Sequence, residues 1–207
     1  HMKKSIPLFL AFATIVSFAF VKPNSKAPKQ INVVIDAGHG GSDFGATSSS
    51  STEKQIVEQI TNKIKFLNKN ENVSVHVTRI GDEFLSLSDR SVIINKIKPD
   101  LVLSLHVNKS SNVAKSGMEF YIANESIANE KSNKIANELR NKFIQNTNLK
   151  ASEIKKAPFF ILKKSEVPAV LVELGYMSNL TDREYLTNDL EQNKIAATII
   201  EFISELK

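Results

Sequence analysis

The sequence predicts an α/β fold: a single domain with a mostly parallel, mixed central sheet and helices on both faces. Strand-like runs alternate with helix-like segments from residue 31 onward, and this alternation is typical of α/β domains. Some strand-like runs, such as LVLSLHV at 101–107, are apolar almost throughout, as buried parallel strands are. A 207-residue chain that is 42% hydrophobic can bury one core. We therefore expect one domain over residues 31–207.

The first elements follow from periodicity. INVVI at 31–35 is predicted to be a buried strand, and 53–67 has apolar residues on one helical face. VSVHVT at 73–78 alternates with period two, which indicates a half-buried strand. The segment 88–97 is predicted to be a helix, with Ser88 as its N-cap and its isoleucines directed inward.

The remaining elements follow the apolar strand at 101–107. MEFYI at 118–122 is predicted to be a strand and 129–145 a long helix with one apolar stripe. Two further strands are predicted at 159–162 and 169–175, and a final helix from about 189 to 206. The strand at 169–175 carries a single charge among alanine, valine and leucine.

The start of the chain has the features of an export segment. Two lysines precede Ile6–Val21, 16 residues without a charge. As a helix this run would span roughly 24 Å, less than the roughly 30 Å of a bilayer's hydrocarbon core. Ser17-Phe18-Ala19 has the small-residue spacing of signal-peptidase sites. We interpret residues 1–21 as an export signal or N-terminal anchor rather than a core helix, with His1 a cloning remnant, and 22–30 as a linker.

Composition limits the partners. The net charge is +5, and cleavage after Ala19 would remove Lys3 and Lys4 and leave +3, too little to indicate nucleic-acid binding. The chain has no cysteine, which excludes thiol catalysis, disulfides and cysteine-ligated zinc. We expect an exported monomer in the periplasm, cell envelope or extracellular space, contacting a membrane only through its N-terminal segment.

Polar residues stand where the predicted strands end. His39 follows the first strand, His106 and Asn108 end the strand at 101–107, and Glu173 lies in the last one. Glu53 opens the helix after the glycine-rich turn. Because ligands in open α/β sheets bind beyond the carboxyl ends of strands, we expect these side chains to meet at one edge.

Each of these residues also has a structural interpretation. Glu53 alone suits a first-turn carboxylate favoured by the helix dipole, and His106 alone suits a hydrogen-bonded core histidine. His76 falls on the polar face of its strand and is interpreted as structural. Glu173 is hardest to explain in this way, because an ionised carboxylate in an apolar strand is costly unless it is paired or metal-bound.

Two imidazoles and one carboxylate with an open fourth position are a ligand set for catalytic zinc. Such a metal lowers the pKa of water and polarises a carbonyl oxygen, and a separate carboxylate is then needed to move the proton. Glu173 suits this second role, because an apolar environment raises a carboxyl pKa. No G-x-S-x-G, H-E-x-x-H or P-loop motif is present in the chain.

Four ordered blocks together resemble a known family. VVIDAGHGGSDFGA is followed by Glu53-Lys54, SLHVN at 104–108 and VPAVLVELGYMSN at 167–179. In this order they resemble the zinc-dependent N-acetylmuramoyl-L-alanine amidases of the Amidase_3 type, over about residues 31–206. Intermediate positions agree: Thr78, Arg79, Leu87, Arg90, Asn95, Asp100 and Gly117.

The resemblance implies a peptidoglycan hydrolase that uses zinc-activated water. The bond cleaved would be the amide between the lactyl group of N-acetylmuramic acid and the first L-alanine of the stem peptide. Carried over by position, His39, Glu53 and His106 would bind one Zn²⁺ per chain, and Glu173 would be the catalytic carboxylate. Asn108 would orient the substrate or the metal loop.

Two other functions remain compatible with the same residues. One is a zinc peptidase that cuts within the stem peptide. The other is a non-catalytic peptidoglycan-binding module on this fold.

Overall fold

The computed structural model describes residues 30–206, which form a six-stranded sheet covered by helices. The predicted export segment 1–21 and residues 22–29 of the predicted linker lie outside the described residues. No helix of the described part combines the length and hydrophobicity needed to cross a bilayer. In chain order the elements are β1 (Ile31–Ala37), α1 (Glu53–Leu67), β2 (Val73–Val77), α2 (Leu87–Ile97), β3 (Leu101–Asn108), β4 (Met118–Ala123), α3 (Asn129–Asn146), β5 (Ala151–Ala157), α4 (Phe160–Lys164), β6 (Ala169–Tyr176), α5 (Leu180–Thr187) and α6 (Asp189–Ser204).

The sheet is mixed, as predicted, with strand order β2-β1-β3-β6-β4-β5. β1, β2, β3 and β6 are parallel, whereas β4 is antiparallel to β6 and parallel to β5. The carboxyl ends of β1, β3 and β6 therefore meet at one edge of the sheet, beside the start of β4.

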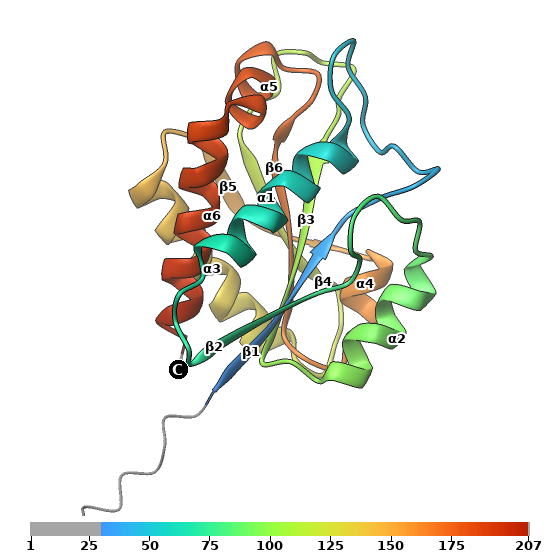
Figure 1. The fold of residues 1–207 in the computed structure, drawn as a ribbon, viewed down its shortest axis with the longest axis vertical. Helices are drawn as coiled ribbons and strands as arrows, with labels where there is room; N and C mark the ends of the chain where they lie inside the picture. Colours follow the sequence, from blue (N-terminus) through green and yellow to red (C-terminus); the bar gives the residue numbers. More distant parts are fainter. Residues whose placement is uncertain (1–29, 207) are drawn as a thin grey trace, which may run out of the picture.

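Helices cover both faces and enclose two cores (Figure 1). On one face, α1, α3 and α6 pack on the sheet through residues such as Ile60, Phe143 and Ile199, which are fully or almost fully buried. On the other face, α2 and α4 bury Ile94 and Leu162 in a smaller core. Side chains alternate along the strands and contribute to both cores. Because helices cover each core, the prediction of helices on both faces is confirmed.

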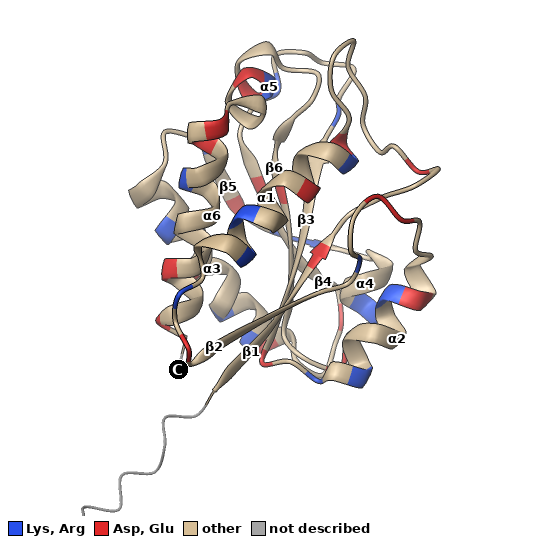
Figure 2. Ribbon diagram, viewed as in Figure 1, with Lys and Arg blue, Asp and Glu red and all other residues tan. Residues whose placement is uncertain are grey.

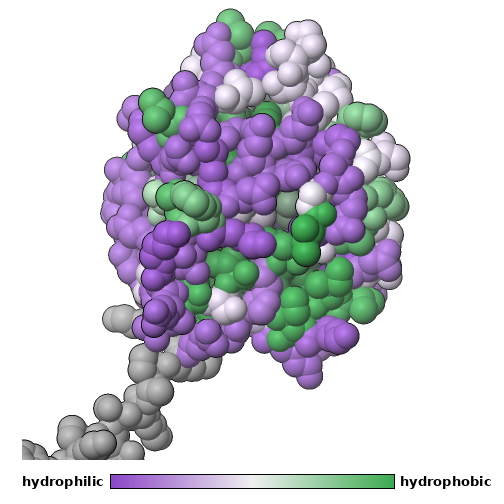
Figure 3. Space-filling model, in the orientation of Figure 1, coloured by the Kyte–Doolittle hydropathy of each residue, from purple (hydrophilic) through white to green (hydrophobic). Residues whose placement is uncertain are grey.

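The helix α2 is less buried than its sequence predicts. Ile94 is buried, but Ile93 and Ile97, also predicted to point inward, are only half-buried. Leu87 and Val92 are exposed on the same helix. Figure 3 shows hydrophobic side chains gathered at the lower right over α2 on a mostly hydrophilic face, and Figure 2 shows charges of both signs along the helices.

One predicted strand is wrong. Residues 159–162 begin the short helix α4, Phe160–Lys164, rather than forming a strand. Pro158 follows the end of β5 and cannot donate a backbone hydrogen bond to continue the ladder. The helical turn buries Ile161 and Leu162 against the smaller core, so the apolar run serves one helical face.

Two elements and one cap were not predicted. β5 is an edge strand whose charged, weakly alternating sequence ASEIKKA gives little strand signal, and α5 is a polar helix of eight residues. The N-cap of α2 is Ser86, not Ser88: its hydroxyl accepts a hydrogen bond from the Asp89 amide at 3.1 Å. Ser88 lies inside the first turn.

A buried carboxylate joins the elements beneath the carboxyl edge. Asp36 of β1 is 1% exposed and accepts hydrogen bonds from Thr78, Ser104 of β3 and Arg90 of α2 at 2.7–2.8 Å. Burial opposes its ionisation, but the charge of Arg90 and these hydrogen bonds prevail. The pKa of Asp36 therefore lies below its ordinary value.

Asp36→Asn is expected to destabilise the fold by about 3–5 kcal/mol at neutral pH, because it leaves Arg90 buried without its counter-ion. A depressed folded-state pKa gives stability that is present above the unfolded value of about 3.9 and is lost as pH falls through the folded value. The difference between wild type and variant should therefore shrink below about pH 4. Denaturant unfolding at several pH values measures it.

Asp189→Asn is the matched control, since Asp189 forms an exposed ion pair with Lys63 at 2.6 Å. It should change stability little. An Asp36→Asn protein as stable as the Asp189→Asn protein at pH 7 would contradict the expectation.

Candidate metal centre

His39 stands on a glycine-rich turn directly after β1. Its own φ is +61°, in the left-handed region, and Gly40 and Gly41 also have positive φ, at 125° and 56°. Its Nδ1 lies 2.8 Å from an Asp43 carboxylate oxygen. This contact fixes the ring and leaves Nε2 directed to the site, as carboxylates that bind the other ring nitrogen do for metal-binding histidines.

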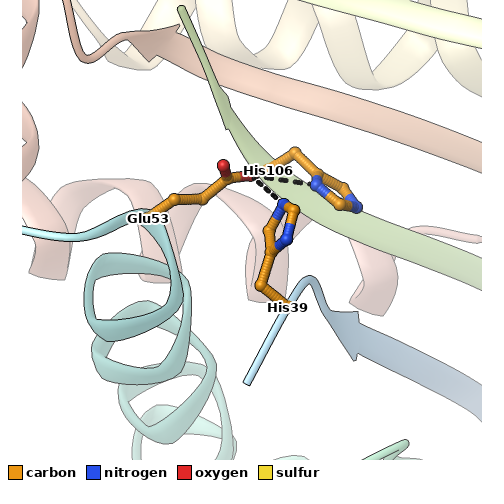
Figure 4. A group of neighbouring side chains, drawn as sticks. All are labelled: His39, Glu53 and His106. Carbon is orange, nitrogen blue, oxygen red and sulfur yellow. Dashed lines mark hydrogen bonds and ion pairs between the residues drawn. The ribbon is translucent and has the colours of Figure 1, made fainter. Parts of the chain in front are cut away.

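Glu53, the first residue of α1, lies between the two histidines (Figure 4). Its Oε1 is 3.0 Å from His39 Nε2 and 3.0 Å from His106 Nδ1. The same oxygen accepts the Val107 amide at 2.9 Å, and Oε2 accepts the Ala46 amide at 2.7 Å. The carboxylate is therefore held in place by backbone donors from β3 and the turn.

His106 projects from β3 toward the same point. Its ring meets the His39 ring edge-on, with centroids 5.1 Å apart. The ring lies over Gly38, where an added Cβ would stand 2.4 Å from His106 Cε1. Only glycine at position 38 admits the imidazole in this position.

These three residues fit a divalent metal. One ligand atom of each, two nitrogens and one oxygen, lies within 4.8 Å of the others. Burial disfavours charged imidazoles, but Glu53 and Asp43 prevail and raise the pKa of His39 to about 9. Glu53, followed by the charge of Glu173, likewise raises the pKa of His106. The site therefore stabilises positive charge, and N/O donors of this kind suit zinc.

Glu173 lies beside the cluster without joining it. It pairs in register with His106 of β3, so both side chains are on the same face of the sheet. Its Oε2 is buried and has no hydrogen-bond partner among the described residues. Burial, reinforced by the charges of Glu53 and Glu119, raises the pKa of Glu173 to about 7.

Glu119 is a site neighbour that the sequence analysis did not identify. It stands opposite Glu173 in the antiparallel β4–β6 pair. Tyr121 donates to its Oε2 at 2.6 Å, Asn108 donates to the same oxygen at 3.2 Å, and Lys155 pairs with Oε1. The sequence did contain a signal for Glu119, because Glu119 is the one charged residue in the strand MEFYIA.

The structure thus places the predicted residues in two groups. His39, Glu53 and His106 form the cluster, while Glu173 and Asn108 lie next to it on β6 and β3. His76 is not part of that cluster: its Nε2 contacts Ser74 and Asn32 instead. Asp43, four residues after His39, was also not predicted.

Gly45→Ala is expected to lower zinc affinity about 10–100-fold, the usual effect of disturbing a metal ligand's support. An added Cβ would lie 2.4 Å from Glu53 Oε2 and 2.7 Å from His39 Cδ2. Gly81→Ala is the matched control, since its φ of +69° is close to the +63° of Gly45 but nothing lies within 4 Å of the new atom. Zinc titration of both metal-free variants tests this, and equal affinities would contradict it.

The chain matches known proteins over nearly its whole described length. Residues 33–205 match the family model described as N-acetylmuramoyl-L-alanine amidase. The uncharacterized protein YqiI of Bacillus subtilis (strain 168) is 32% identical over 172 residues, which cover 81% of each chain. The probable cell wall amidase LytH of Staphylococcus saprophyticus is 32% identical over 182 residues, 86% of this chain but 59% of LytH.

Solved structures share the fold. The N-acetylmuramoyl-L-alanine amidase from Clostridium difficile 630 superposes with a TM-score of 0.80 at 28% identity, over 85% of this chain and 96% of that one. The catalytic domain of CwlV, an amidase from Bacillus (Paenibacillus) polymyxa, gives 0.78 at 32% identity, over 85% and 97%.

Proposed function

The chain belongs to the N-acetylmuramoyl-L-alanine amidase family, and we propose that it is a peptidoglycan hydrolase. Its reaction would cleave the amide between the lactyl group of N-acetylmuramic acid and the L-alanine of the stem peptide. One observation carries this proposal: three metal-ligand atoms within 4.8 Å of one another lie beside a buried carboxylate with no hydrogen-bond partner on Oε2 among the described residues. LytH, which resembles this chain, is named a probable cell wall amidase.

His39, Glu53 and His106 would hold one zinc ion. Bound there, zinc supplies a Lewis acid that acidifies water and polarises a carbonyl group. Asp43 keeps the His39 ring oriented through Nδ1, and the Val107 amide holds Glu53. These contacts hold His39 and Glu53 in position without a bound metal.

Glu173 would transfer the proton. A carboxyl group with a pKa of about 7 is half ionised at neutral pH, so it accepts a proton from water and returns it to the leaving nitrogen. Glu119 does not compete for this role. Burial opposes its ionisation, but Lys155 and Tyr121 prevail and keep its pKa below the usual range. Asn108 would orient the substrate next to Glu173, and its side chain is fixed by Glu119 and the Lys109 amide.

The proposed place of action is outside the cytoplasm. Peptidoglycan lies there, and the apolar run Ile6–Val21 suits an export signal or an anchor. A monomer suffices, because all five proposed site residues come from one chain.

Digestion of purified sacculi tests the activity directly. The zinc-loaded chain should release intact stem peptides with a free amino-terminal L-alanine, identified by mass spectrometry. A peptidase cutting within the stem would instead leave a peptide remnant attached to the glycan. Binding of sacculi without zinc and without released peptide would favour the non-catalytic module.

A further inference from the structure

We propose that Arg79 and Arg90 are positioning residues that lock the His39 turn in its metal-binding conformation before a metal is bound. The inference rests on the proposed function in one respect, because it assigns His39 as a metal ligand. The juxtaposition that carries it is structural: two buried guanidinium groups meet on three consecutive backbone carbonyls, those of residues 37, 38 and 39.

Arg79 approaches the turn from the segment after β2. Its side chain is 1% exposed. Nε donates to Ala37 O at 3.1 Å and Nη2 donates to Gly38 O at 3.4 Å. Nη2 also donates to Lys54 O at 3.1 Å, in the residue next to Glu53. One guanidinium thus ties the turn that carries His39 to the helix start that carries Glu53.

Arg90 approaches the same turn from α2 and is 3% exposed. Nη1 donates to Ala37 O at 2.6 Å, so this carbonyl accepts from both arginines. Nη2 donates to His39 O, the carbonyl of the ligand residue itself. Both arginines carry a counter-ion, Asp36 for Arg90 at 2.8 Å and Glu58 for Arg79 at 3.2 Å. The pairs offset the charges that would otherwise repel a nearby cation.

The turn needs such restraint. The left-handed region is unfavourable for a residue with a side chain, and His39 has a φ of +61° between two glycines. Strained backbone persists only where the surrounding contacts determine it. The planar fork of a guanidinium reaches several carbonyls at once, which a lysine ammonium on a flexible stem does not.

A merely structural role for these arginines would lower stability without changing zinc affinity in molecules that remain folded. Arg79→Met is the sharper variant, because its partner Glu58 is 27% exposed and keeps solvent contact. Arg90→Met would instead leave the buried carboxylate of Asp36 without its counter-ion. Arg140→Met is the matched control: Arg140 Nε donates to Ser152 O at 2.6 Å and Nη2 pairs with Glu153 at 2.8 Å, on β5.

The experiment uses the full chain without metal, and two measurements. Zinc affinity is measured by competition with a chromophoric chelator, and amide hydrogen exchange is followed over residues 38–45. Arg79→Met should bind zinc about 10–100-fold more weakly and exchange faster over this segment, whereas Arg140→Met should match wild type in both. If Arg79→Met does not fold, Arg79→Lys replaces it, since it keeps the charge toward Glu58 but loses the fork.

A folded Arg79 variant with wild-type zinc affinity and wild-type exchange over 38–45 would overturn the inference. Failure of the proposed function gives a different result, in which wild type releases no intact stem peptide from sacculi. If wild type also binds no zinc, the assignment of His39 as a metal ligand fails, and the exchange comparison still decides whether Arg79 restrains the turn.

Discussion

Replacing His106 by alanine is expected to remove the bound zinc and to lower hydrolysis of peptidoglycan on the order of 10³-fold or more. Metal Lewis acids supply several kcal/mol of transition-state stabilisation, and each 1.36 kcal/mol corresponds to about tenfold in rate. The loss should be large because His106 supplies one of the three ligand atoms that the described residues bring together. The remaining pair, His39 and Glu53, would leave a zinc ion with two protein ligands instead of three.

Elemental analysis of the purified variant measures the metal, and peptide release from sacculi measures the rate. His76→Ala is the matched control, since His76 is also a half-buried strand histidine and its Nε2 lies within hydrogen-bonding distance of Ser74 and Asn32. The His76→Ala protein should retain its bound zinc and its rate of peptide release. Removal of zinc by a chelator should reproduce the His106→Ala loss in wild type, and added zinc should reverse it. Stoichiometric zinc in the His106→Ala protein would contradict the assignment.

The clustering of the three proposed ligands could be predicted because parallel strands constrain where their ends lie. Once β1 and β3 are predicted to be buried strands of one mostly parallel sheet, His39 and His106 are expected at the same edge. Glu53 follows, since the helix after the first strand begins at that edge. Glu173 was indicated by its place in a strand of the same sheet and by the free-energy cost of an ionised carboxylate in an apolar strand.

Other parts of the site depend on information that local patterns do not hold. The position of Glu119 opposite Glu173 follows from the antiparallel β4–β6 register, which pairs strands far apart in sequence. The convergence of Arg79 and Arg90 on the turn depends on where α2 packs. Residues 159–162 resembled a strand because four apolar residues suit either a buried strand or a buried helical turn. Tertiary packing decided among these alternatives.

Replacing Glu173 by glutamine is expected to keep zinc bound and to lower kcat about 10²–10⁴-fold, the usual contribution of general acid–base catalysis. Glutamine preserves the size of the side chain but has no basic oxygen, so water would lose its proton acceptor.

Glu119→Gln is the matched control, because it removes a carboxylate on the same face at the register position opposite Glu173. The Glu119 carboxylate is already bound by Lys155 and Tyr121, so the kcat of the Glu119→Gln enzyme should fall less than tenfold. The two carboxyl groups have pKa values pushed in opposite directions, and such a separation assigns the proton-transferring role to the raised one. Turnover of zinc-loaded Glu173→Gln close to wild type, or a larger loss in Glu119→Gln, would assign the role to another group.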